Sequence, residues 1–104
     1  MARYDFSQLF ERYPNVIEQM PYIFTSHQFI LQLAQQNQTR YIEALYAYRY
    51  NDDGEALAPF MTVHGILAKE LNTFTGLIEI VRKDAKSTDI FGRSGECALW
   101  RKIR

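Results

Sequence analysis

Apolar residues recur at helical spacing at the start of the chain. A helix is predicted over 5–13, capped by Asp5 and followed by Pro14, because one face carries Phe6, Leu9, Phe10 and Tyr13. A short helical turn over 15–20 is expected to point three apolar side chains inward, those of Val16, Ile17 and Met20. The next stretch, 22–24, fits a short strand.

The strongest start signal for a helix lies at Thr25. Gln28 stands three residues later, so the two side chains can form a capping box with the backbone of the first turn. Phe24 and Phe29 flank this box as a hydrophobic staple. Asn37 is expected to end the helix, whose apolar face consists of Phe29, Ile30, Leu33 and Ala34.

Residues 39–50 are compatible with two structures. The spacing of Tyr41, Leu45 and Tyr48 favours a second helix, whereas the tyrosines and the alternation in "ALYAYRY" favour a strand. We expect the helix and keep the strand as the alternative. The segment 51–59 is predicted to be a loop because Asp and Gly supply turn chemistry there.

The stretch "TVHGILAKELN", residues 62–72, is predicted to be a third helix with a glycine in its middle. Gly65 in a helix interior costs about 1 kcal/mol relative to alanine, so its presence calls for a reason. The face opposite the apolar one carries small and polar residues, namely Thr62, Gly65, Lys69 and Asn72. The bare backbone at Gly65 is therefore expected to lie close to another surface.

The last third favours a β-hairpin over 77–103. "GLIEIVRKD" is rich in β-branched residues, and the alternation in "ECALWRKIR" puts Ala98 and Trp100 on one face. Trp100 is expected in the core, together with Phe24, Phe29, Phe60 and Phe74. The segment "AKSTDIFGRSG" between the strands is predicted to form an extended, partly basic loop.

The composition is that of one globular domain. The chain has 104 residues, 47% hydrophobic and 23% charged, and Cys97 is its only cysteine. The lone cysteine and the absence of a signal-peptide pattern favour a reducing, cytoplasmic location. No stretch approaches the roughly 20 apolar residues that span a bilayer, so no membrane role is expected.

Charge is unevenly distributed although the net charge is zero. Residues 1–59 carry four Lys/Arg and seven Asp/Glu, whereas residues 60–104 carry eight Lys/Arg and five Asp/Glu. Such asymmetry can mark a basic binding face, and the alternative is a solvated hairpin surface. The cations of the second half are Lys69, Arg82, Lys83, Lys86, Arg93, Arg101, Lys102 and Arg104.

Three helices followed by a hairpin resemble a winged helix-turn-helix domain. The resemblance covers residues 24–104 and predicts an α+β fold of three helices plus a C-terminal β-hairpin. Residues 1–23 would be an N-terminal helical extension, whose aromatic helix is expected to self-associate with a second chain. The link "YNDDGEALAP" departs from the pattern because a helix-turn-helix has a turn of three or four residues.

The resemblance implies binding to double-stranded DNA, as a transcriptional or mobile-element regulator. Residues 62–72 would be the recognition helix and 77–103 the wing, with contacts from Thr62, Gly65, Lys69, Asn72, Lys83, Lys86 and Arg93. The alternative for Thr62 is a helix cap. The alternative function is a non-catalytic protein-interaction module with the same fold.

No enzyme or cofactor signature is present in the sequence. His27 and His64 are interpreted as packing or surface residues. Together with Cys97 they lack metal-ligand spacing, so no metal site is expected. The protein is therefore predicted not to be an enzyme and to need no cofactor.

Overall fold

The computed structural model describes residues 4–103, so Arg104 of the basic set and the first three residues of the predicted extension lie outside it. The chain begins with α1 (Ser7–Phe10) and α2 (Tyr13–Gln19). The single helix predicted over 5–13 is wrong, because it breaks at Glu11 and Arg12 and Pro14 lies in the first turn of α2. Proline is tolerated there since first-turn N–H groups have no helical partner.

The predicted short strand and capping box are confirmed. β1 (Ile23–Thr25) leads directly into α3 (Ser26–Gln36). The Gln28 amide N–H donates to the Thr25 hydroxyl at 3.1 Å, and the Thr25 amide donates to the Gln28 side chain at 2.8 Å. Asn37 ends α3, and α4 (Gln38–Ala47) follows at once. The helical alternative for 39–50 is therefore correct.

The third expected helix begins earlier than the sequence indicated. α5 (Pro59–Glu70) has Ala58 at its N-cap position and continues into the 3₁₀ turn η1 (Leu71–Thr73). The cap interpretation of Thr62 is wrong, because Pro59 starts the helix and Thr62 falls in its second turn. The link from α4 to α5 is long, with Tyr50 bridged to Ala56 at its base.

The C-terminal strands β2 (Ile78–Thr88) and β3 (Ser94–Lys102) form an antiparallel hairpin, and β1 adds to β3 to give the order β1-β3-β2. The extended loop predicted between them is wrong: only residues 89–93 connect the strands. Asp89 makes this possible because its carboxylate accepts from the amides of Phe91 and Arg93, at 2.9 and 3.0 Å. Gly92 supplies the positive φ of 82° that the turn requires.

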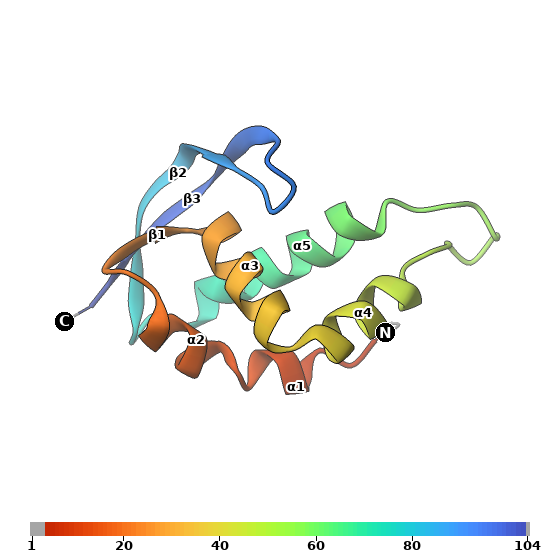
Figure 1. Cartoon of the computed structure of the whole chain (residues 1–104), viewed down its shortest axis with the longest axis horizontal. Helices are drawn as coiled ribbons and strands as arrows, with labels where there is room; N and C mark the ends of the chain where they lie inside the picture. The colour runs from red at the N-terminus through yellow and green to blue at the C-terminus, as the bar shows by residue number, and fades with distance from the viewer. Residues whose placement is uncertain (1–3, 104) are drawn as a thin grey trace.

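β2 contains more residues than the part of β3 that it pairs with. Ile80 pairs with Trp100 and Arg82 with Leu99, so one residue of β2 is extra there, and the register shifts again before Ala85. Bulges of this kind bend a strand and increase its twist. The hairpin is curved, and its loop turns back toward α5 (Figure 1).

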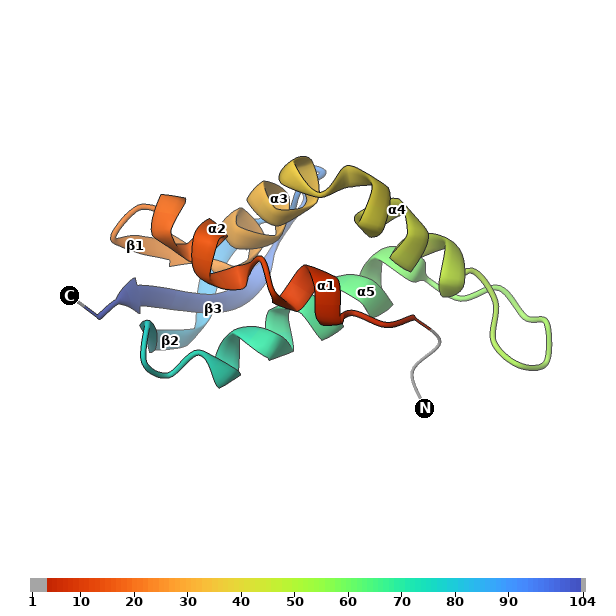
Figure 2. The same ribbon diagram turned by 90° about the horizontal axis from the view of Figure 1, so that it is seen from below.

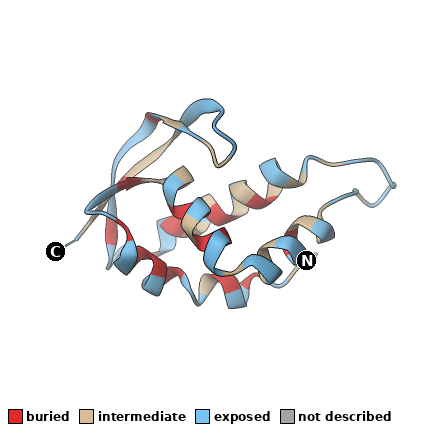
Figure 3. Ribbon diagram, viewed as in Figure 1, coloured by how far each residue is buried: buried red, intermediate tan, exposed pale blue. Residues whose placement is uncertain are grey.

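One hydrophobic core joins the helices to the sheet. α3 lies centrally, with α2 on one side and α5 and the hairpin on the others (Figures 1 and 2). The buried side chains of this core include Phe24, Phe29, Val63, Leu67, Leu71 and Trp100. The buried positions of α1, α2, α3 and α5 face this interior, whereas the loop between α4 and α5 is mostly exposed (Figure 3). The structure is thus α+β, as expected.

The N-terminal helices belong to this core. Phe6, Leu9 and Tyr13 are buried in it, and the Tyr13 hydroxyl donates to the Leu67 carbonyl of α5 at 2.6 Å. The aromatic face that was expected to pair with a second chain is covered by the chain itself, so the structure lends self-association no support. Phe60 was expected in the core but is 45% exposed, because the first turn of α5 extends past α3 to the hairpin loop.

Candidate functional site

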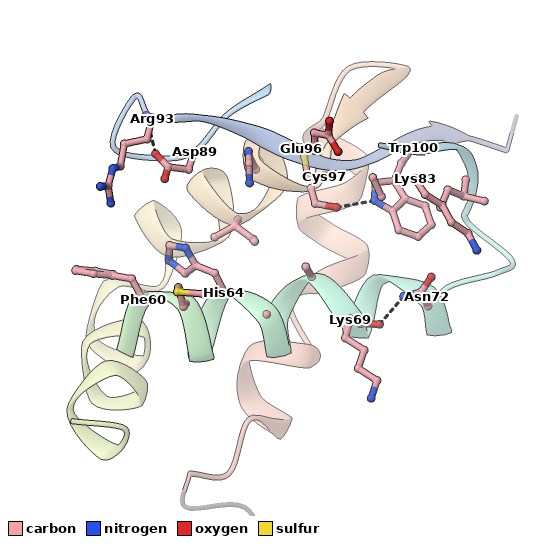
Figure 4. Close-up of a pocket in the computed structure, with 18 of the residues that line it drawn as sticks. Phe60, His64, Lys69, Asn72, Lys83, Asp89, Arg93, Glu96, Cys97 and Trp100 are labelled. Atoms are coloured by element: carbon pink, nitrogen blue, oxygen red, sulfur yellow. Dashed lines mark hydrogen bonds between the residues drawn. The ribbon is translucent and has the colours of Figure 1, made fainter. Parts of the chain in front are cut away.

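An open cleft of about 810 Å³ separates α5 from the hairpin. In Figure 4, α5 forms one wall, and β3 with the 89–93 loop forms the other. One face of α5 lines the cleft with residues spaced by one helical turn, and the opposite wall includes Ala98 and Trp100. Of the seven residues predicted to bind DNA, five line this cleft, namely Gly65, Lys69, Asn72, Lys83 and Arg93.

Gly65 is exposed on this face, and its lack of a side chain is not needed by the fold. A Cβ built at Gly65 would meet no other atom within 4 Å, apart from the backbone of its own helix. The glycine therefore does not exist to let α5 pack against the rest of the chain. What it leaves is a strip of uncovered helix backbone, open to a molecule that approaches from outside.

The cations of the hairpin and α5 fall into two groups, those engaged within the described chain and those without an ion pair there. Arg82 pairs with Asp84 and Arg101 with Glu79, while the Lys102 ammonium donates to the carbonyls of Glu18 and Met20. These three cations are therefore engaged within the described chain. No such ion pair is recorded in the described part of the chain for the four cations predicted to bind DNA, which are Lys69, Lys83, Lys86 and Arg93.

The predicted site residues do not all lie together. Thr62 is half-buried and does not line the cleft, because the second turn of α5 turns it away. Lys86 lies farther along β2, opposite Glu96 in the strand pair. Asn72 is exposed in η1, and its side-chain amide donates to the Lys69 carbonyl at 3.1 Å, which ties the end of the helix.

The hairpin loop closes one end of the cleft through an aromatic contact. Phe91 packs edge-to-face on Phe60, with ring centroids 4.6 Å apart, and lies parallel to the His64 ring at 6.4 Å. Phe91 was not among the residues singled out by sequence. The signal for it was present in "DIFGR", where the Asp and Gly spacing fixes a tight turn and so aims the residue between them.

His64 is held by α4 as well as by the loop. The Tyr41 hydroxyl lies 2.5 Å from His64 Nε2. Burial lowers the pKa of His64, although the nearby Asp89 carboxylate opposes this, and burial raises the pKa of Tyr41 to about 12. Both groups are therefore neutral at pH 7, and a hydrogen bond joins the tyrosine hydroxyl to the imidazole nitrogen.

The second histidine, His27, also lines the cleft, from the first turn of α3. Its Nδ1 is buried and has no hydrogen-bond partner in the described structure.

Within residues 4–103 no three His, Cys, Asp or Glu side chains converge closely enough to hold a metal ion. None of the helices in that range has the length and apolar content to cross a bilayer.

The site has electrostatic features of both signs. Lys69, Lys83 and Arg93 lie along the cleft together with Asp89 and Glu96, so its charge is only slightly positive. Asp89 accepts hydrogen bonds from the Arg93 and Phe91 amides, which hold its carboxylate in the loop and lower its pKa.

Searches against models of protein families, curated proteins and solved structures found no match to this chain.

Proposed function

We propose that the protein binds double-stranded DNA through the exposed Gly65 face of α5, which borders the cleft, and through the adjoining hairpin, in the manner of a winged helix. The observation that carries this proposal is the combination at α5 of bare backbone and unpaired cations. Gly65 is open to solvent and unneeded by the fold, and Lys69 lies one turn away without a carboxylate partner among the described residues. Helix backbone and cations in this arrangement suit approach to a phosphate backbone.

The topology supports the winged-helix assignment. β1 precedes the helices α3, α4 and α5, the hairpin follows them, and β1 joins the sheet at β3. In this proposal α5 is the recognition helix and the hairpin is the wing. The departure foreseen in the sequence remains, because α4 and α5 are joined by the long link 48–58 in place of a tight turn.

A second candidate function, a protein-interaction module, rests on a different surface. Ile42, Tyr46 and Tyr50 follow at intervals of four residues along α4 and past its end, and they are 61%, 63% and 50% exposed. The Arg49 guanidinium lies 3.6 Å from the centre of the Tyr46 ring. Exposed aromatic residues with an arginine are enriched at protein interfaces.

A titration with fluorescently labelled duplex of mixed sequence separates the two functions. DNA binding predicts association at low salt that weakens steeply as salt rises, since each phosphate contact releases counterions. The interaction module predicts no duplex binding at low salt or at high salt. Tyr46→Ala, which changes the exposed aromatic surface of α4, should leave duplex affinity unchanged under the DNA proposal. Absence of binding at low salt would refute the proposal.

A further inference from the structure

The interior of the cleft is too small for the proposed DNA partner. A volume of about 810 Å³ lies within the range of small-molecule sites, which is roughly 300–1,000 Å³. A recognition helix enters a major groove about 12 Å wide with its outer surface, so a duplex would contact the rim of this cleft and leave its interior free. The interior therefore needs its own explanation, which does not depend on DNA binding.

The deep part of the cleft is apolar. Ile30 of α3, Ala68 of α5 and Ala98 of β3 line it, together with Trp100, which is 4% exposed. Trp100 is fixed in place because its indole N–H donates to the buried Ser26 hydroxyl at 2.9 Å. Small side chains on two facing walls, next to a fixed aromatic ring, leave room for an apolar body.

A cation without a recorded ion pair stands at each end of the cleft. Lys83 lies beside Trp100 at one end, and Arg93 lies near Phe60 at the other (Figure 4). Among the described residues Lys83 makes no recorded ion pair. At the other end the Asp89 carboxylate, which accepts hydrogen bonds from backbone amides, also interacts electrostatically with Arg93 and offsets its charge. Of the two end cations, Lys83 is therefore better placed to receive an anionic group.

We propose that the cleft binds a small organic anion, with its apolar body against Ala68, Ala98 and Trp100 and its anionic group at Lys83. The site lies between the two elements that the DNA proposal assigns to recognition, but it stands on its own observations.

The probe for this site is 1-anilinonaphthalene-8-sulfonate, which carries an apolar body and one anionic group. Its neutral analogue N-phenyl-1-naphthylamine has the same body without the sulfonate. Trp100 is the only tryptophan of the chain and borders the cleft, so energy transfer from it to the dye reports binding at this place. We expect saturable binding at one site and weaker binding of the neutral analogue.

Three variants locate the dye. Ala68→Leu fills the apolar wall and should weaken binding of the sulfonate by at least about tenfold. Lys83→Gln should weaken it by about two- to fivefold, as for a partly solvated ion pair, without affecting the neutral analogue. The matched change Lys86→Gln removes the same charge from the same strand outside the cleft and should have no effect.

Several results would overturn the proposal. These are absence of saturable transfer from Trp100, equal affinity for the two dyes, and equal effects of Lys83→Gln and Lys86→Gln. Near-UV circular dichroism of Trp100 checks that Ala68→Leu keeps its tertiary structure. If it does not, the exposed lysine pair alone decides the question, because neither side chain packs in the core. Failure here leaves duplex binding intact as a separate result.

Discussion

Phe91 at the turn of the hairpin contacts Phe60 in the first turn of α5, with ring centroids 4.6 Å apart and planes at 70°. The contact joins the turn between β2 and β3 to a helix that begins some 30 residues earlier. It forms because two register shifts bend β2 and because Asp89 holds the loop in a tight turn. The rings, 53% and 45% exposed, remain accessible at the mouth of the cleft.

This contact should be measurable as a coupling energy. Phe60→Ala and Phe91→Ala, singly and together, form a double-mutant cycle whose interaction term for an aromatic pair is about 0.5–1.5 kcal/mol. Chemical denaturation of the four proteins gives the term directly. Additive effects within about 0.3 kcal/mol would mean that the loop does not rest on α5 in solution.

Substitution of Gly65 should separate stability from binding. Gly65→Ala meets no atom within 4 Å outside its helix backbone, so it should raise the free energy of unfolding by up to about 1 kcal/mol. The added methyl group should weaken duplex binding if DNA lies against this backbone. Gln35→Ala, an exposed change on α3, is the control that should leave binding unaltered. Stabilisation with unchanged duplex affinity would remove Gly65 from the interface.

The hairpin cations should appear in the salt dependence of binding. Lys86→Ala should lower affinity for all duplex sequences and reduce the slope of log K against log salt by about 0.9, the value for one phosphate contact. Arg12→Ala removes the same charge from the start of α2, where its side chain makes no cap hydrogen bond, and should change neither quantity. Equal effects of the two variants would indicate net charge in place of a defined contact.

Acid should destabilise the protein through His64. Burial lowers the pKa of His64 below its usual 6.5, so the unfolded chain takes up a proton at a higher pH than the folded protein does. Stability from the neutral imidazole is therefore complete above about pH 6.5 and is lost as pH falls toward the lowered value. Asp89 has its pKa lowered from 3.8, so its own contribution is lost only at more acidic pH.

Urea denaturation at pH 5.5 and 7.5 tests this assignment. The fall in free energy of unfolding between the two should be smaller in His64→Gln than in the wild type. His27→Gln, which makes the same change at the other histidine of the cleft, is the matched control. If His64→Gln shows the full acid sensitivity of the wild type, the lowered pKa of His64 and its bond with Tyr41 are contradicted.

The sequence predicted those elements whose signals are local. The capping box at Thr25 and the helix predicted over 62–72 depend on residues a few positions apart; the structure contains both, and the helix begins earlier. The break at Arg12 was missed because Pro14 indicates a helix end or a helix start equally well. The exposure of Phe60 depends on the position of the hairpin loop relative to α5, which no local sequence pattern encodes.

The candidate site was predicted as a face and observed as a cleft. The wheel position of Gly65 and Lys69 follows from helical periodicity, so their common face could be read from sequence. The opposite wall could not, because it depends on bulges in β2 that the hydrophobic pattern of the strand does not reveal. The unpaired Nδ1 of His27 likewise becomes visible only when α3 and the hairpin are placed together.

Glycine amides offer the most direct test of the proposed DNA interface. They fall in a resolved region of a nitrogen–proton correlation spectrum, and the chain places them at informative positions. Gly65 lies on the open face of α5 and Gly92 and Gly95 lie in or beside the hairpin loop, whereas Gly54 lies in the link between α4 and α5. On titration with duplex DNA, the account predicts progressive shifts or broadening at Gly65 and at the hairpin glycines, with Gly54 unmoved. Shifts confined to Gly54 and its neighbours, or a spectrum unchanged by the duplex at low salt, would contradict it.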